Sequence, residues 1–460
     1  MNVLAEAAGV IAASPELVPA RSQMAFTLGF HIVLAALGVA FPAITLVANY
    51  RGLRHDDREA LLLARRWSKV MAVLFAVGAV TGTVLSFEMG LLWPELMRRF
   101  GPAFGVPFAI EGIFFFLEAI FIAIYIYGWT RLSPWAHFWT GVPIVISGLG
   151  GAFSVVAANA WMNQPAGFEL GPDGVVSSVE PLEVIFNRAT TYEVPHMILA
   201  AYMVAGFLVA SVYAVGMLRG RRDRYHRIGL MIPLTVACLA TPVQIFVGDV
   251  AARGVADHQP AKFAAMEYVT ETGPNQDEHL GGVLIDGEVK GAISIPNLDS
   301  FLVGFSADTV VTGLDDIPDD REPPAPTLLH LSFDAMVGIA FALLGLAAWF
   351  GIVWWRRREL PRTPWFLRAV AVSGVAAVVA MECGWIVTEV GRQPWVVYGH
   401  MRTEDAITGA EGVWITFASV LVLYTALGAA TVAVLRTMSR RWRLEGEDDL
   451  DVPYGPPVDR

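Results

Sequence analysis

The sequence is poor in charge and almost without cysteine. Charged residues make up 16% of the 460 positions, whereas soluble domains carry about 25%. The two cysteines, Cys238 and Cys383, lie in apolar runs and form no Cys-x-x-Cys motif. These absences argue against a disulfide framework, a cysteine zinc site and a covalently attached c-type haem. The net charge of −11 argues against a nucleic-acid partner, because binding phosphates requires a basic surface.

The sequence also shows no cleavable leader and no internal repeat. Residues 1–19 have no basic start and contain Glu6 and Glu16, so they do not read as a signal peptide. The lack of a repeat counts against a transporter built from inverted halves.

Long apolar runs are abundant, and hydrophobic residues make up 55% of the chain. A bilayer core about 30 Å thick requires about 20 apolar residues in one helix. Nine runs meet this requirement, so we predict an all-α polytopic membrane protein with nine transmembrane helices. The predicted spans are 24–48, 70–92, 106–129, 136–160, 195–217, 228–248, 328–355, 368–388 and 413–435.

Basic residues concentrate in some of the connections between these spans and are few in the others. The connections after the first, fifth and seventh spans and the segment after the ninth are rich in arginine, and the others are not. The positive-inside rule therefore predicts an N-terminus outside and a cytoplasmic C-terminus. This assigns helices one to six to 1–248, an extracytoplasmic loop to 249–327, helices seven to nine to 328–436 and a cytoplasmic tail to 437–460.

Ionisable residues inside the spans mark candidate functional positions, because a charge in the hydrocarbon core is costly. Most of them lie toward the predicted outer ends of their spans, which suits a buried cofactor site better than a pore. Glu111 and Glu118 are seven residues apart and share a helix face, and so do Trp385 and Glu389 at a spacing of four. The candidates are His31, Glu88, Glu111, Glu118, His196, His330, Asp334, Met336, Glu382 and Glu389.

Each candidate also has a purely structural explanation. A single intramembrane histidine can hydrogen-bond a neighbouring helix, and a single methionine usually packs. Paired glutamates could serve a cation transporter. Periodicity by itself does not decide between these explanations and a cofactor site.

Short motifs occur along the chain in a recognisable order. Gly-Arg-Gln-Pro-Trp at 391–395 follows the step from Trp385 to Glu389, and Arg21-Ser22-Gln23 precedes His31. Further motifs lie at 109–118, 159–165, 248–267 and 333–338. Together they resemble subunit I of the cytochrome bd quinol oxidases, over the chain from Arg21 to about the ninth span.

The resemblance implies the haem subunit of a quinol:oxygen oxidoreductase, a terminal oxidase of the bacterial cytoplasmic membrane. It implies that His196 and Met336 ligate a low-spin haem b, and that His31 and Glu389 are the axial ligands of two high-spin haems. One of these is haem b and the other is haem d or a second haem b. Which ligand serves which haem stays open.

The resemblance also assigns residues around the haems and at the quinol. Trp385 would pack between haems, and Arg21 and Arg392 would pair with haem propionates, since guanidinium suits a carboxylate. Lys262 and Glu267, in the 249–327 loop, resemble residues that take part in quinol oxidation.

Proton delivery is implied for Glu111 and Glu118, with Glu88 and Lys69 as further candidates. Quinol would be oxidised at the outer face, and protons for water would come from the cytoplasm. The enzyme would thus build a proton gradient without pumping.

The implied partners are a second large membrane subunit (subunit II), small accessory subunits, ubiquinol or menaquinol, O2 and the bilayer. Two departures limit the transfer of properties. Asp334 stands two positions before Met336, where some members of the family have arginine, and the 249–327 loop is on the short side. The potential of the low-spin haem and the choice of quinone are therefore not implied.

Two other classes compete with the oxidase hypothesis. A secondary transporter would use Glu111, Glu118 and Glu389 for coupling and would carry no chromophore. A quinol-linked cytochrome b without oxygen chemistry would need only His196 and Met336.

Overall fold

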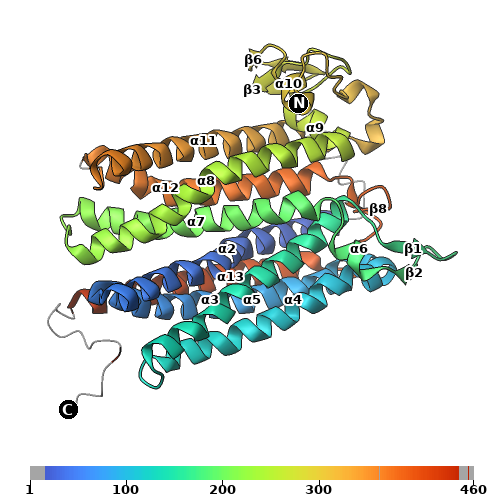
Figure 1. Ribbon diagram of the computed structural model, residues 1–460. Coiled ribbons are helices and arrows are strands. Elements are labelled where there is room, and N and C mark those ends of the chain that lie inside the picture. Colours follow the sequence, from blue (N-terminus) through green and yellow to red (C-terminus); the bar gives the residue numbers. More distant parts are fainter. Residues whose placement is uncertain (1–15, 362, 445–453, 455–460) are drawn as a thin grey trace.

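The computed structural model describes residues 16–361, 363–444 and Tyr454. In this part of the chain, nine helices are long and apolar enough to cross a membrane, which confirms the nine predicted spans. They lie side by side in one bundle, as Figure 1 shows. The helices are α2 Leu17–His55, α3 Arg58–Leu92, α4 Pro94–Gly128, α5 Pro134–Asn163, α7 Thr190–Leu218, α8 Arg224–His258, α11 Pro326–Arg357, α12 Pro364–Gly391 and α13 Val413–Leu444.

Local sequence accounts for where several of these helices begin. Proline occupies the first turn of α4, α5, α11 and α12, where its missing N–H costs nothing. The Asp57 carboxylate accepts from the backbone N–H of Ala60 at the start of α3, and Asp223 does the same for His226 in α8. Each bond satisfies a backbone donor that the first turn leaves unpaired.

The helices extend beyond the predicted spans. The chain remains helical to His258, although the predicted loop begins at residue 249. Asp249 and Arg253 form an ion pair one turn apart in this extension. Hydropathy marks where an apolar run ends, whereas a helix can continue into water on polar residues, so the two limits differ. The N-terminal segment 1–15 and most of the predicted tail lie outside the described residues.

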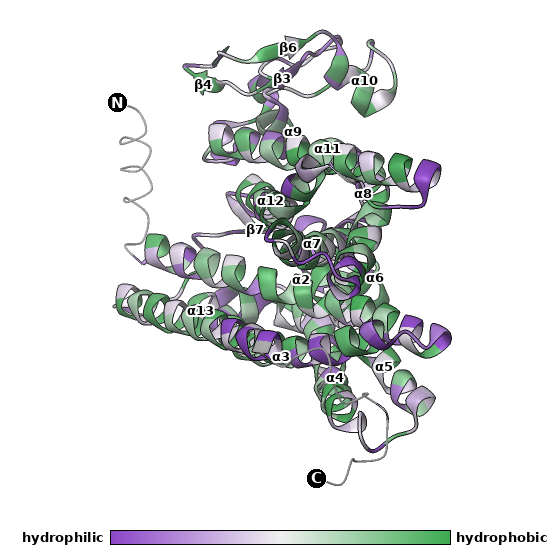
Figure 2. Cartoon of the chain, turned by 90° about the vertical axis from the view of Figure 1, so that its left-hand side faces the viewer, coloured by the Kyte–Doolittle hydropathy of each residue, from purple (hydrophilic) through white to green (hydrophobic). Residues whose placement is uncertain are grey.

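The bundle is built around α2. This helix packs against α3, α5, α7 and α13, while α7 packs on α8 and α12, and α4 packs on α5. A large buried cluster that includes Phe41, Trp67 and Phe207 fills the space between them. Hydrophobic residues are frequent along the long helices (Figure 2). Several of their large apolar side chains are exposed, among them Phe87, Phe116 and Leu239, as expected of helices that face lipid or another membrane subunit.

Short elements gather at one end of the bundle, on the right in Figure 1. Two small antiparallel sheets lie there, β1 with β2 and β7 with β8. Phe168 pairs with Val179 in the first sheet, and Trp395 pairs with Arg402 in the second. The elements are β1 Phe168–Leu170, β2 Val176–Val179, α6 Pro181–Ile185, β7 Trp395–Val397 and β8 Met401–Arg402.

The connection between α8 and α11 forms a folded cap at the same end. Its strands pair as β3 with β6 and β4 with β5, and the β4–β5 hairpin turns at Asp286-Gly287, both with positive φ, as a two-residue hairpin turn requires. A cluster that includes Phe263, Met266 and Leu329 packs α9 onto α11. The elements of the cap are α9 Pro260–Glu267, β3 Glu278–Leu280, β4 Val283–Ile285, β5 Glu288–Lys290, β6 Ile293–Ile295 and α10 Leu298–Gly304, followed by the 3-10 turns Leu314–Asp316 and Asp319–Arg321.

Candidate functional site

Most of the predicted site residues line one cavity of about 510 Å³ inside the bundle. The cavity lies among α2, α3, α4, α5, α7 and α12, and apolar side chains make up much of its wall. The predicted residues that line it are Arg21, His31, Glu111, Glu118, Trp385, Glu389 and Arg392. Residues more than 350 positions apart in the chain thus share one buried space.

His31 is held with one ring nitrogen free. Its Nδ1 lies 2.9 Å from the Thr81 hydroxyl, which leaves Nε2 available as a metal ligand. Gly82 lies against the ring, and a Cβ at this position would come within 2.9 Å of Cε1 of His31. The glycine therefore provides the room in which the imidazole sits.

Glu389 is oriented by two donors at the end of α12. Asn159 Nδ2 donates to Oε1 at 2.7 Å, and Arg392 Nη2 donates to Oε2 at 2.5 Å. Each oxygen keeps a further lone pair for a cation. Arg392 is 3% exposed, and its Nε and Nη1 have no hydrogen-bond partner among the described residues. A buried guanidinium with unpartnered donors suits an anionic group in the cavity.

His196 and Met336 lie on α7 and α11, and each is flanked by a glycine of a neighbouring helix. A Cβ at Gly248 of α8 would lie 3.4 Å from Cε1 of His196, and a Cβ at Gly384 of α12 would lie 3.0 Å from the Met336 sulfur. The Gln244 amide nitrogen lies 3.2 Å from Nδ1 of His196. A residue larger than glycine at position 248 or 384 would therefore crowd the side chain of His196 or Met336.

A continuous chain of hydrogen bonds joins Lys262 to Glu389. Lys262 Nζ donates to Gln259 Oε1 at 2.7 Å, and Gln259 Nε2 donates to Asn163 Oδ1 at 3.3 Å. Asn163 Nδ2 donates to Asn159 Oδ1 at 3.3 Å, and Asn159 donates to Glu389. The predicted quinol residue and a predicted haem ligand therefore belong to one polar network.

Glu193 is a member of this network that the sequence analysis missed. Its carboxylate accepts from Asn163 Nδ2 at 2.9 Å. Glu193 is an acid next to an apolar run, but it lies two residues before the predicted fifth span, 195–217, and so is not among the ionisable residues inside the spans. Burial lowers the pKa of Lys262 to about 8, and the negative charge of Glu193 opposes that decrease. Glu193 therefore provides part of the negative charge that keeps the buried lysine protonated.

Glu267 lies at the end of α9 and is 4% exposed. Burial raises the pKa of this carboxyl well above its usual range, and the neighbouring acids Glu278 and Asp334 raise it further. A protonated, neutral side chain is therefore favoured at this position. Lys262, on the same short helix, lies against Gly391, where a Cβ would come within 2.7 Å of the lysine side chain.

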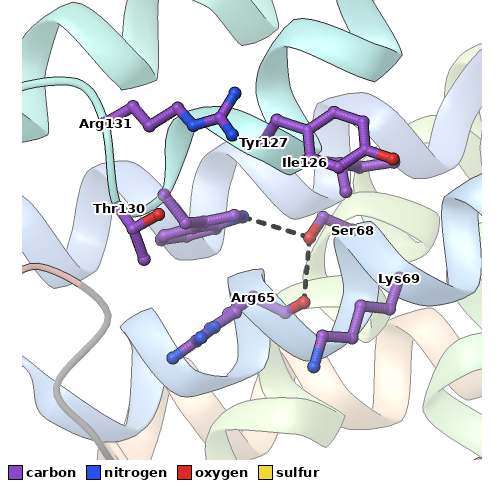
Figure 3. Close-up of a pocket in the computed structure, with 8 residues that line it drawn as sticks. Arg65, Ser68, Lys69, Ile126, Tyr127, Thr130 and Arg131 are labelled. Atoms are coloured by element: carbon purple, nitrogen blue, oxygen red, sulfur yellow. Dashed lines mark hydrogen bonds between the residues drawn. The ribbon is translucent and has the colours of Figure 1, made fainter. Parts of the chain in front are cut away.

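Glu88 and Lys69 do not line the cavity that holds Glu111 and Glu118. Glu88 is buried and accepts from Gln23 at 2.8 Å and from Thr27 at 2.5 Å. Lys69 lines a separate pocket of about 200 Å³, formed mainly by α3 and the α4–α5 turn. Figure 3 shows this pocket, with the Ser68 hydroxyl at its centre.

Asp334 contacts the cap and does not line the cavity. Its carboxylate accepts from the backbone N–H of Gly281 at 2.5 Å and lies 3.3 Å from Nε2 of His330. The His330 Nδ1 lies 2.7 Å from the carbonyl oxygen of Met266. These contacts tie α9 and the β3–β4 turn to α11, the helix that carries Met336.

Fold and site together define a class of protein. A multi-pass helical bundle encloses a largely apolar cavity that presents a free imidazole nitrogen, a carboxylate and a buried guanidinium with unpartnered donors. This donor set fits haem, whose iron takes axial side-chain ligands and whose propionates take arginine.

Comparisons with known proteins identify the family. Residues 19–442 match the family described as "Cytochrome bd terminal oxidase subunit I". A "putative cytochrome bd menaquinol oxidase subunit I" of Bacillus subtilis is 36% identical over 91% of this chain and 96% of its own length. A "cytochrome bd ubiquinol oxidase subunit 1" of the same organism is 28% identical over 96% of this chain and 97% of its own length.

A solved structure agrees. The chain is similar to a chain in "The structure of bd oxidase from Geobacillus thermodenitrificans", with 36% identity, a TM-score of 0.86, and coverage of 92% of this chain and 98% of that one. The chain belongs to the cytochrome bd oxidase subunit I family. It is a multi-pass membrane subunit of a quinol-oxidising terminal oxidase, and this membership implies haems and a subunit II partner.

Proposed function

We propose that this subunit oxidises quinol at the outer membrane face and takes protons from the cytoplasm for the reduction of O2 to water. The observation that carries the proposal is the hydrogen-bonded chain from Lys262 to Glu389. It connects the candidate quinol residues on α9 with the cavity in which the candidate oxygen-site residues lie. The competing transporter and the cytochrome b without oxygen chemistry have no place in this family.

The haem assignments follow from the same residues. His31 and Glu389 would hold the two high-spin haems in the cavity, one haem b and the other haem d or a second haem b. His196 and Met336 would hold a low-spin haem b, with Trp385 packed between haems and Arg21 and Arg392 on propionates. When bound, haem iron would supply one-electron transfer and, at the high-spin haems, the binding of O2.

At the quinol site, Lys262 and Glu267 have complementary roles. The Lys262 ammonium would donate a hydrogen bond to a quinol oxygen and orient the ring. Glu267, which is favoured in its protonated form, would pass its proton outward and take up a hydroxyl proton as the quinol is oxidised. Both residues are buried, so water is largely excluded around the reacting hydroxyl.

Proton delivery from the cytoplasm would use Glu118 and then Glu111. The two lie two turns apart on α4 and line the same cavity, and Glu118 is the nearer to the end with the arginine-rich turns. A carboxylate that faces the cavity can receive a proton from one side and release it to the other. Because the quinol protons leave outside, each turnover moves charge across the membrane without a pump.

We propose menaquinol as the quinol that this subunit oxidises. The relative with 36% identity is named a menaquinol oxidase, whereas the relative with 28% identity is named a ubiquinol oxidase. We also propose that small accessory subunits join subunit II in the complex, that the membrane is the bacterial cytoplasmic membrane, and that the predicted outer loop, 249–327, binds the quinol.

The test is a reduced-minus-oxidised absorption spectrum of the purified complex, together with O2 consumption under menaquinol and ubiquinol. We expect low-spin b and high-spin haem bands and faster turnover with menaquinol. His196→Ala and Met336→Leu should each remove the low-spin band and quinol oxidation while some high-spin haem remains. A full low-spin band in both variants would refute this ligand pair.

A further inference from the structure

Three acids from separate elements of the cap meet in one buried cluster. Glu267 ends α9, Glu278 begins β3 and Asp299 lies in α10, and their exposed fractions are 4%, 8% and 1%. One carboxylate oxygen from each residue lies within 4.8 Å of those from the other two. We call these residues the acid triplet.

The basic side chains near the acid triplet decide how many of its carboxylates can be ionised. In the described part of the chain, no lysine or arginine forms an ion pair with any of the three. Three buried carboxylates at this separation cannot all be ionised without a large electrostatic cost. The triplet must therefore carry shared protons or a cation.

The closeness of the carboxyl groups within the triplet favours protons. An oxygen of Asp299 lies within 4.8 Å of one of Glu278, and burial together with the neighbouring Glu278 raises the pKa of Asp299, so a proton on one of the two acids is favoured. Glu267 Oε2 and Asp299 Oδ2 are buried without a partner, so each can receive or pass on a proton. Burial raises the pKa of Asp299, as it does that of Glu267.

The surrounding charges are also acidic. Asp277 adjoins Glu278 on β3, and Asp334 faces Glu267 from α11 next to His330. Glu278 is the member with the largest exposed fraction and is followed by the half-buried His279. The triplet thus leads from the end of α9 toward the surface of the cap.

We propose that Asp299 and Glu278 carry the proton released by quinol from Glu267 to the outer aqueous phase. The inference rests on the proposed role of Glu267 as the first acceptor. Because Glu267 rests protonated, it first passes its proton to Asp299, while Asp299 passes its own proton to Glu278. As quinol is oxidised and O2 takes its electrons in the established reaction, a quinol O–H bond breaks and the proton bonds to the vacated Glu267 carboxylate. Glu278 then releases its proton to water, so each acid returns to its starting state.

The experiment compares Asp299→Asn and Glu278→Gln in the complete oxidase complex, with Glu288→Gln as a matched control at an exposed position of the same cap. Because a positioned proton carrier contributes about a hundredfold or more, we expect each triplet variant to lose at least about tenfold in quinol oxidation rate. The haem spectrum and the rate with an artificial electron donor should stay unchanged. Formate, a small acid that can carry protons, should restore part of the quinol rate in the triplet variants.

Three results would overturn the relay. These are an unchanged quinol rate in both triplet variants, an equal loss with both donors, or a loss that formate does not restore. A tightly bound calcium or magnesium ion that Asp299→Asn removes would assign the triplet to a cation instead. Glu267→Gln distinguishes failure of the relay from failure of the proposed role of Glu267. If this variant keeps full quinol oxidation, the proposed role of Glu267 fails. If it is inactive while Asp299 and Glu278 are dispensable, only the relay fails.

Discussion

At Lys262, burial and charge act in opposite directions. Removing the ammonium from water lowers its pKa, whereas the carboxylate of Glu193 raises it, and the balance lies near physiological pH. In the proposed quinol site, the protonated Lys262 would donate a charge-assisted hydrogen bond to quinol, which is stronger than the bond that the neutral amine could donate. The residue that sequence analysis missed therefore influences one that it identified.

Glu193→Gln should lower the pKa of Lys262 further, because the substitution removes a negative charge and keeps the shape. The protonated lysine is then lost at a lower pH as pH rises. We expect the KM for quinol to begin rising below pH 8, earlier than in the wild type, with a smaller effect on kcat. Steady-state kinetics across the pH range measures this.

The matched control is Glu169→Gln, which removes an acid from an exposed position in β1. It should leave the pH dependence of KM unchanged, and Glu193→Asp should retain much of the wild-type profile. An identical profile for Glu193→Gln and the wild type would show that the two charges are not coupled.

Among the elements, the close contact of α2 and α3 decides how His31 is presented. The ring nitrogen that bonds Thr81 and the glycine that lies against the ring both come from α3. Hydropathy predicted both helices, but it carries no information on which residues of one face the other. The contact follows from packing, since small residues allow helices to approach closely.

Gly82→Ala should displace His31, because the new Cβ would lie 2.9 Å from Cε1 of the ring. Overpacking of this kind costs about 1–3 kcal/mol, and here the ring can relieve it by leaving its bond to Thr81. We expect a reduced high-spin haem content with the low-spin band retained. Absorption spectra and haem content per protein measure the effect.

Gly90→Ala on the same helix is the control, because among the described residues no atom outside the adjoining helix backbone lies within 4 Å of a Cβ there. It should bind haem as the wild type does. Normal high-spin content in Gly82→Ala would mean that His31 does not depend on this contact.

For the whole molecule, the arginine-rich turns and the folded cap lie at opposite ends of the bundle. The tight turns after α2, α7 and α11 are at one end, and the cap and the small sheets are at the other, as Figure 1 shows. The positive-inside rule would place the turns in the cytoplasm. The quinol site and the acid triplet would then lie outside.

Cysteine labelling tests this orientation. Glu288→Cys in the cap and Arg221→Cys in the α7–α8 turn both introduce a thiol at an exposed position. A membrane-impermeant maleimide added to intact spheroplasts should label the first variant and not the second. Labelling of Arg221→Cys alone would reverse the proposed direction of proton movement. The parent protein contains Cys238 and Cys383, which lie in helices, and its labelling gives the background level.

The sequence by itself determined the number of spans and the residues most worth testing. A long apolar run can satisfy its backbone in lipid only as a helix, so local composition is sufficient for the nine spans. An ionisable residue in such a run stands out because a charge in the hydrocarbon core is costly. This cost identified His31, Glu111, Glu118 and Glu389 as candidates. The order of the short motifs along the chain then indicated the family.

Only the tertiary structure decided which of these residues meet. Asn159 and Glu389 are 230 positions apart, and Asn163 and Gln259 are 96 apart, so no local pattern links them. The acid triplet likewise draws one residue from each of three cap elements. Hydropathy and helix periodicity describe how each segment faces its surroundings, whereas the partners of a buried polar group depend on how separate segments pack. That packing produced the network from Lys262 to Glu389 and brought together the acid triplet on which the proposed proton path rests.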